Sequence, residues 1–196
     1  MTRPTKNRQV PFDLDFPPNE QLPRKFSISF SELETEAGIS VRVVLDAKTQ
    51  LGDIISDNNR EPDFYRYHDV FHYTFATLLG WSPCTRALMK CKRKSNPLVD
   101  EFEDGARATI TEEAVSLLVF NEAKQKEYFQ STRISRSLLR IIREMTQNFE
   151  VRDRTAKDWE NAIYSAYEIF LRLSESKGGI VEFDADEKSV FFKAAA

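Results

Sequence analysis

The sequence predicts an α+β fold that is mostly α, with a core of about five helices and a short β-hairpin near each end. Hydrophobic residues alternate along residues 26–30 and 39–43, which is typical of strands with one buried face. Short hydrophobic runs at 180–183 and 189–192 flank a polar turn. Between them, hydrophobic residues recur every three or four positions over residues 64–171, as in amphipathic helices. We expect the two hairpins to meet in one small sheet.

The composition is that of an ordinary globular chain, with 41% hydrophobic and 30% charged residues in a length of 196. A net charge of −3 gives no general attraction to nucleic acid or membranes. The sequence has no apolar run of membrane-spanning length and no signal-peptide core. Cys84 and Cys91 lie seven residues apart within one predicted helix, too far for a disulfide. We therefore expect a cytoplasmic protein with reduced thiols.

Residues 1–25 are predicted to form a proline-rich extended arm, and residues 26–196 a single α+β domain. Within the arm, Phe12, Leu14 and Phe16 alternate, which favours docking of this part as an edge strand.

The domain is expected to open with an antiparallel hairpin of residues 25–30 and 39–45, with Gly38 in the connection. Residues 51–59 then form a predicted loop. The closing hairpin follows Gly178 and turns over residues 184–188.

The predicted helices begin at Asp63, Pro83, about Ala106, Ile134 and Ala156. The first ends at Gly80, and Ser82 is the expected N-cap of the second, which Asn96 and Pro97 end. The third runs to Phe129 and is apolar almost all round at residues 114–120, so we expect it to be central and buried. A capping box at Thr155 and Asp158 opens the last helix.

The most chemically specific stretch contains both histidines of the chain, His68 and His72, together with Asp69. On a helix these positions share a face, so the three side chains can converge on one point. Imidazole and carboxylate groups at this spacing form half of a divalent-metal or proton-transfer site. The alternative is structural: the histidines pack a helical core while Asp69 accepts a hydrogen bond or pairs with Arg66.

Further metal ligands are expected from Glu112 and Glu113, which begin the otherwise apolar middle of the third helix. A carboxylate buried there needs a positive partner, and a divalent ion or an arginine would serve equally well.

A short basic run offers a candidate phosphate site, because Arg86, Lys90 and Arg93 line one face at helical spacing. The alternative is a solvated helix face balanced by the acidic residues 100–104. The run is too short to predict nucleic-acid binding.

The series HDVFH, LGWSP, KRKS, VDEFEDGAR and EEA, which begins at His68, is specific. It resembles the domain that follows the catalytic part in certain MazG-type nucleotide pyrophosphohydrolases. The likeness extends from about Pro18 to Phe192 and includes PPNEQLPRKFSISF, LGDIISDN and GGIVEFDAD, so it covers nearly the whole chain.

The stretch from Tyr67 also resembles, more faintly, a metal-binding helix of the catalytic MazG fold. On this resemblance Asp69 matches the family aspartate, while Glu112 and Glu113 match its paired glutamates. The order of the two helices is reversed, and Ser116 stands where a further glutamate is expected.

Two functions follow from these observations. The first is a metal-dependent nucleotide (pyro)phosphohydrolase with Asp69 and Glu113 as catalytic carboxylates. Its divalent metal, Mg or Mn or else Zn, would be held by His68, Asp69, His72, Glu112 and Glu113. The second is a non-catalytic nucleotide-sensing or regulatory module that partners a hydrolase or a defence effector. Either function implies a nucleotide or other phosphorylated small molecule as ligand.

The hydrophobic residues of the predicted helices indicate a homodimer. Ile141, Ile142, Met145 and Phe149 would expose a patch if their helix packed with one face only. We expect the contact within residues 134–170, unless the N-terminal hairpin and arm cover this patch within one chain.

Overall fold

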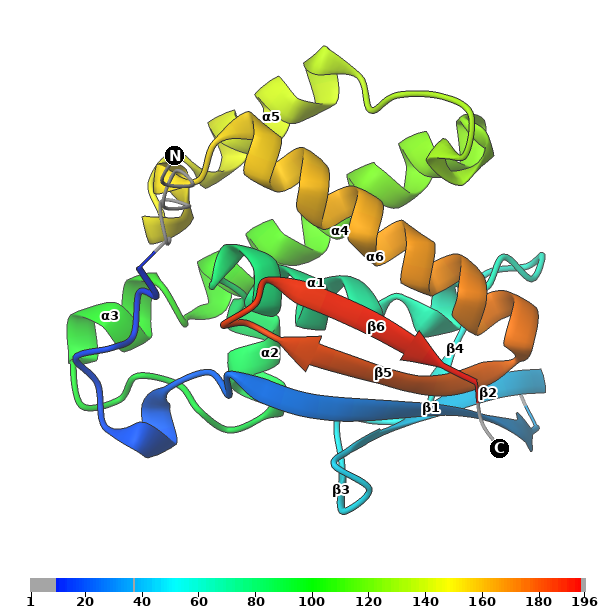
Figure 1. The fold of residues 1–196 in the computed structure, drawn as a ribbon, viewed down its shortest axis with the longest axis horizontal. Helices are drawn as coiled ribbons and strands as arrows, with labels where there is room; N and C mark the ends of the chain where they lie inside the picture. Colours follow the sequence, from blue (N-terminus) through cyan, green and yellow to red (C-terminus); the bar gives the residue numbers. More distant parts are fainter. Residues whose placement is uncertain (1–9, 37, 195–196) are drawn as a thin grey trace, which may run out of the picture.

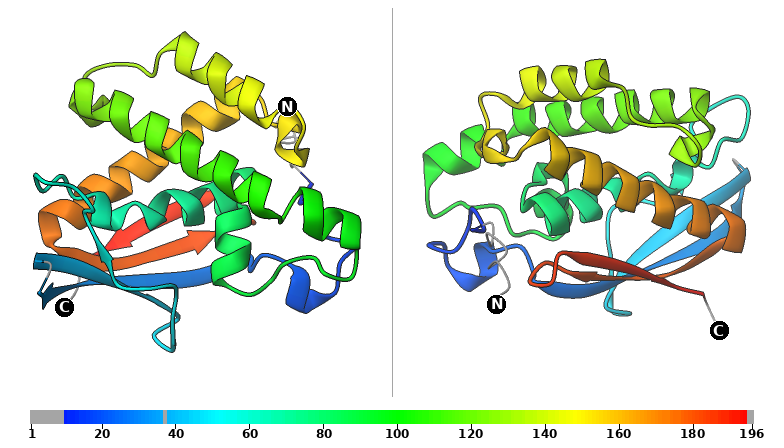
Figure 2. Two further views of the ribbon diagram at one scale, coloured as in Figure 1. Left: turned by 180° about the vertical axis from the view of Figure 1, so that it is seen from behind. Right: turned by 45° about the horizontal axis from the view of Figure 1, so that its top comes forward.

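The computed structural model describes residues 10–36 and 38–194. One antiparallel sheet forms the base of the molecule, and the helices lie on one side of it (Figures 1 and 2). Residues 1–9 of the predicted arm lie outside the described residues. The predicted α+β class is confirmed.

The sheet has six strands in the described part of the chain, in the order β3-β2-β1-β5-β6, with β4 also paired to β2. The strands are β1 Lys25–Thr35, β2 Gly38–Leu45, β3 Thr49–Gln50, β4 Ile55–Ser56, β5 Gly178–Asp184 and β6 Ser189–Lys193. Both predicted hairpins are present, and they meet as expected because β1 pairs with β5. The sheet is not limited to terminal hairpins, because β3 and β4 also pair with β2. β4 lies within the predicted loop of residues 51–59, which corrects that prediction.

The inner face of the sheet is built by alternation. Phe26, Ile28 and Phe30 of β1 are buried, and they lie opposite Phe183, Val181 and Gly179 of β5 in the register. The rings of Phe26 and Phe183 stack with their centroids 4.7 Å apart. This apolar face is the surface on which the helices pack.

The helices are α1 Asp69–Leu79, α2 Pro83–Leu88, α3 Pro97–Phe102, α4 Ala106–Gln125, α5 Arg136–Thr146 and α6 Ala156–Ser176. Short 3₁₀ helices lie at Pro18–Glu20, Tyr65–Tyr67, Glu127–Phe129 and Glu150–Asp153. The predicted capping box is confirmed, because Thr155 and Asp158 each bond the backbone N–H of the other.

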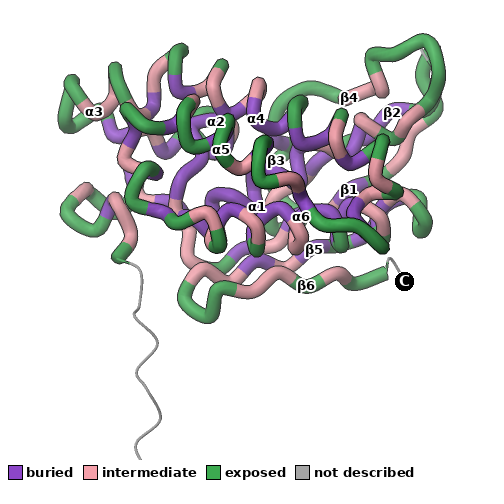
Figure 3. The backbone as a smooth tube through the Cα atoms, turned by 90° about the horizontal axis from the view of Figure 1, so that it is seen from above, coloured by how far each residue is buried: buried purple, intermediate pink, exposed green. Residues whose placement is uncertain are grey.

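The positions of α1 and α4 correct the sequence analysis. α1 was expected to be amphipathic, yet every residue of it except Leu78 is buried, and it packs against the sheet, α4 and α6. α4 was expected to be central, yet Leu117 and Leu118 within its apolar middle are exposed. Figure 3 shows buried backbone concentrated around α1. α1 is therefore the central helix of the molecule.

Several element boundaries also differ from the prediction, each where the backbone adopts a left-handed conformation. Phe64 has φ of 65°, and α1 begins only at Asp69. Lys90 has φ of 58° just after α2, so the second helix does not continue to Asn96. Non-glycine residues rarely adopt such angles, which cannot continue a right-handed helix.

Residues 10–24 contain no strand, which corrects the predicted edge strand at Phe12, Leu14 and Phe16. Asp13 anchors it instead, with ion pairs to Arg24 and Arg86. No helix in the described ranges is long and apolar enough to cross a membrane.

Candidate metal centre

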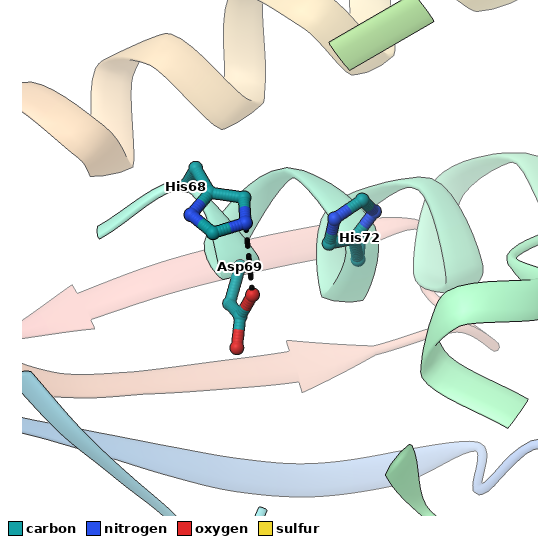
Figure 4. Close-up of side chains that lie close together, drawn as sticks. All are labelled: His68, Asp69 and His72. Carbon is teal, nitrogen blue, oxygen red and sulfur yellow. Dashed lines mark ion pairs between the residues drawn. The ribbon is translucent and has the colours of Figure 1, made fainter. Parts of the chain in front are cut away.

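The N-terminal turn of α1 brings His68, Asp69 and His72 together, as the sequence predicts (Figure 4). One ligand atom from each of the three side chains lies within 4.8 Å of the other two. Nε2 of His68 is 3.4 Å from Oδ1 of Asp69, and the two imidazole rings are nearly perpendicular, with centroids 5.7 Å apart. The cluster sits on the most buried helix of the fold.

Glu112 holds His72 from the other side of the ring. Nδ1 of His72 lies 2.8 Å from Oε1 of Glu112, and both side chains are almost completely buried. Glu112 also accepts hydrogen bonds from the Ser82 hydroxyl at 2.7 Å and from the Cys84 backbone N–H at 2.9 Å. Three donors therefore surround this carboxylate, so it is already satisfied by protein groups.

The other ring nitrogen of His72 is an unsatisfied atom. Its Nε2 is buried and has no hydrogen-bond partner among the described residues, and Oε2 of Glu113 lies 3.5 Å away. The Glu113 side chain is 46% exposed, whereas His72 is 1% exposed. Glu113 is thus the most solvent-accessible of these side chains.

His68 repeats the same arrangement. Its Nδ1 lies 2.9 Å from the backbone oxygen of Tyr65, which can only accept a hydrogen bond, so the proton of the neutral ring is on Nδ1. Nε2 then carries a lone pair that faces Asp69. The Tyr65 ring stacks on His68 with centroids 4.2 Å apart and fixes its plane. Each imidazole is consequently anchored through Nδ1 and presents Nε2 to a carboxylate.

The ionisation of the cluster follows from burial and from these partners. Burial lowers the pKa of His68, which leaves its Nε2 unprotonated near neutral pH. Burial also opposes charge on His72, but the facing Glu112 carboxylate outweighs it and raises the pKa of His72. The adjacent His72 imidazole lowers the pKa of Glu113 to about 2. A cation between His72 and Glu113, either a proton or a metal ion, is therefore favoured.

The separations fit a metal ion. Two donors bound at roughly 2.1 Å to one tetrahedral ion lie roughly 3.4 Å apart, close to the 3.4 Å found for the His68–Asp69 pair. His72 completes a group of ligand atoms within 4.8 Å of one another, and Glu113 lies outside this group. Imidazole nitrogens mixed with carboxylates fit Zn²⁺ better than Mg²⁺, which prefers oxygen ligands. Glu112 orients His72 from behind, as carboxylates commonly do for histidine ligands.

The predicted phosphate-binding residues lie elsewhere and do not share a surface. Arg86 is buried and pairs with Asp13 at 2.8 Å. Arg93 is buried and pairs with Asp104 at 2.7 Å. Lys90 is exposed. The two arginines are therefore components of buried ion pairs.

Sequence reasoning missed the supporting residues Tyr65, Ser82 and Cys84. Ser82 was recognised as an N-cap, and it caps α2 as expected. Its second bond, to Glu112 thirty residues later, depends on the packing of α2 against α4 and has no local signal. The proposed pairing of Asp69 with Arg66 is not found, because Arg66 pairs with Glu32 and Asp57.

The comparisons with known proteins concern the whole chain. The family model of the MazG C-terminal domain matches residues 7–196. Neither the curated proteins nor the solved structures contain a significant match. The match covers the arm, the sheet, and the helices that form the His68 cluster. The chain therefore belongs to the MazG C-terminal domain family.

Proposed function

We propose that the chain is a divalent-cation-binding accessory module related to MazG proteins, and that it acts by binding rather than as a self-sufficient hydrolase. The ion is held by His68, Asp69 and His72, whose ligand atoms lie within 4.8 Å of one another. Glu113 lies beside His72, and Glu112 orients His72.

One observation carries this proposal: two imidazoles, each anchored through Nδ1, present Nε2 to a carboxylate at 3.4 and 3.5 Å. A lone pair that faces a carboxylate is unfavourable unless a cation lies between them. A proton on Nε2 of His72 fills the gap to Glu113, whereas the lone pair of His68 Nε2 beside Asp69 leaves a place for a divalent ion. Zn²⁺ suits this donor set best, and Mn²⁺ is the second choice.

Restricted access supports a binding role over catalysis. The side chains of His68 and Asp69 are mostly buried, and His72 almost completely so. A nucleotide phosphoanhydride needs cationic groups near its phosphates. Arg86 and Arg93, which were expected to supply them, are neutralised by buried carboxylates. The ion then stabilises the junction between α1 and α4.

The second candidate function is a metal-dependent nucleotide (pyro)phosphohydrolase. The half-exposed Glu113 beside Nε2 of His72 favours it, because this side of the cluster is open to solvent. A bound divalent ion there supplies Lewis-acid chemistry, polarising a phosphate and acidifying a water. Asp69 and Glu113 would be the carboxylates placed to accept the proton of that water.

Calorimetry on the full chain tests the shared basis of both candidates. We expect Zn²⁺, and more weakly Mn²⁺, to bind with one ion per chain. His68→Ala and Glu113→Gln should abolish or weaken binding, whereas Glu101→Gln, at an exposed carboxylate of α3, should leave it unchanged. Absence of binding by any of Zn²⁺, Mn²⁺ and Mg²⁺ would remove the metal centre.

Turnover then separates the two candidates. The Zn²⁺- or Mn²⁺-loaded chain is incubated with the nucleoside triphosphates, and pyrophosphate or phosphate release is measured. Binding of metal without turnover supports the accessory module. Turnover that disappears in His68→Ala but persists in Glu101→Gln supports the hydrolase.

We also propose a homodimer, but with a contact different from the predicted one. Ile142 and Phe149 of the predicted patch are buried within the chain itself. The exposed apolar surface lies on the outer face of α4, where Ile110 is 68% exposed and Leu117 48% exposed. These residues are seven positions apart, or two turns on one helix face. A second copy seated there would also cover Glu113, which lies between them in sequence.

A further inference from the structure

A cavity of about 780 Å³ lies beside Phe64, at the N-terminal end of the Tyr65–Tyr67 3₁₀ helix. His68 of the metal centre follows the C-terminal end of the same helix. The cavity is half open to solvent and is lined by the ends of β1 and β2, by β4, by the loop of residues 57–64 and by the C-cap of α6. None of His68, Asp69, His72 and Glu113 lines it. Its volume is within the range of small-molecule sites. The cavity is thus a second, separate feature of the molecule.

The floor of the cavity is an ordered charge network around Arg66. This guanidinium is buried and pairs with Glu32 and Asp57, each at 2.8 Å. The Tyr67 hydroxyl donates to Oε1 of Glu32 at 2.9 Å, so this oxygen receives bonds from both Tyr67 and Arg66. Oε2 of Glu32 receives no hydrogen bond from the described residues. A fixed carboxylate oxygen therefore remains available to accept an N–H from a ligand.

One wall of the cavity is aromatic. Phe64 is 38% exposed and has a left-handed backbone with φ of 65°. The guanidinium of Arg66 lies 4.7 Å from the centroid of its ring. A bulky residue in this conformation is uncommon, and such strain persists only where the surrounding structure imposes it. The ring is thereby held at the cavity, where a flat ligand could stack on it.

The rim of the cavity is positively charged. Arg60 and Lys177 are exposed, and neither forms an ion pair with another described residue. Arg60 belongs to the loop after β4, and Lys177 is the C-cap of α6. With Arg66, the lining carries three cationic groups against the two carboxylates of Glu32 and Asp57, a balance of +1. The uncompensated charge lies at the rim and suits a phosphate group.

We propose that this cavity binds a nucleotide. Arg60 and Lys177 contact the phosphate, Phe64 stacks on the base, and Oε2 of Glu32 accepts an N–H of the base. Stacking and the partly buried Glu32 acceptor favour an aromatic ring that carries donors, which sugar phosphates lack. The inference deepens the proposed accessory function by naming a ligand class, but it does not rest on the metal centre.

Calorimetry with the full chain and nucleoside monophosphates tests the proposal, with inorganic phosphate and ribose 5-phosphate as comparison ligands. We expect at least one nucleotide with an amino-bearing base to bind about tenfold or more tightly than ribose 5-phosphate. Equal binding of nucleotide, ribose 5-phosphate and phosphate would overturn the proposal, because it would show an anion site only. No binding of any of them at millimolar concentration would also overturn it.

Variants locate the site. Arg60→Ala and Lys177→Asn change exposed side chains, and asparagine tolerates the left-handed conformation of Lys177. Each should weaken nucleotide binding about tenfold, while Lys48→Ala, at an exposed lysine outside the cavity, should not. His68→Ala should bind nucleotide normally even where it has lost the metal. Unchanged affinity in both rim variants would contradict the assignment. If the wild-type chain binds Zn²⁺ but no nucleotide, the cavity proposal fails and the metal-centre proposal stands.

Discussion

Oδ2 of Asp13 lies 2.8 Å from Nη2 of Arg86, and both side chains are buried. This pair joins the N-terminal arm to α2, the short helix whose first residues hold Glu112. Arg86 also donates to the backbone oxygens of Glu20 and Cys91. The arm is thereby connected to the support of the metal centre through one guanidinium.

Replacement of Asp13 tests that connection. Asp13→Asn leaves the buried Arg86 without its carboxylate, and removal of one partner from a buried pair typically costs about 3 kcal/mol or more. Urea unfolding should show a loss of this size. Asp15→Asn, at an exposed neighbour, is the control and should change stability by less than about 0.5 kcal/mol. Equal effects of the two variants would show that the pair contributes little.

The same carboxylate gives a pH prediction. Burial opposes ionisation of Asp13, but the hydrogen bond from Arg24 and the charge of Arg86 prevail and lower its pKa below the ordinary value of 3.8. A lowered pKa in the folded state means that the ionised carboxylate stabilises the fold above pH 3.8. The stability difference between wild type and Asp13→Asn should therefore be constant near neutral pH and shrink below pH 3.8. A difference that does not shrink as the pH falls below 3.8 would contradict this.

Removal of the charge on Glu112 should weaken the metal centre without removing a ligand. Glu112→Gln retains an oxygen for Nδ1 of His72 but loses the charge that makes the imidazole a stronger donor. Loss of such an orienting carboxylate typically lowers metal affinity about 10- to 100-fold. We expect Glu112→Gln to lower the Zn²⁺ affinity by about the same factor. Zn²⁺ titration against a competing chelator measures the change, with Glu101→Gln as the unaffected control. Unchanged affinity would exclude an orienting role for Glu112.

The proposed dimer contact can be broken at Leu117, an exposed apolar residue of this face of α4. The chain has a mass of 22.7 kDa, so a dimer has twice that, 45.4 kDa. Light scattering at micromolar concentration should give the dimer mass for wild type and the single-chain mass for Leu117→Lys. Ile54→Lys, at an exposed residue of the loop after β3, should remain dimeric. A wild-type mass near 22.7 kDa would eliminate the dimer.

Local patterns predicted much of the fold. Alternation along β1 and β2 and the capping box at Thr155 depend on neighbouring residues only, and the structure confirms them. The convergence of His68, Asp69 and His72 follows from helical spacing and is also found.

The relative burial of α1 and α4 could not be obtained in this way. The apolar run at 114–120 indicates a hydrophobic helix but not how many neighbours cover it, and Leu117 faces away from α1 and α6 into solvent. Conversely, Thr74 and Thr77 suggest a polar face on α1, yet both are buried. Arg86 and Arg93 misled for a related reason, because their carboxylate partners Asp13 and Asp104 are set by tertiary packing.

The pairing of β1 with β5 has a consequence for synthesis of the protein. β1 leaves the ribosome before its partner, which begins at Gly178 and is made only after the helices of the described chain. Until then one edge of β1 has no partner, and its apolar face cannot be fully covered. Such edges promote association between nascent chains. We therefore expect the sheet to be completed only after β5 emerges from the ribosome.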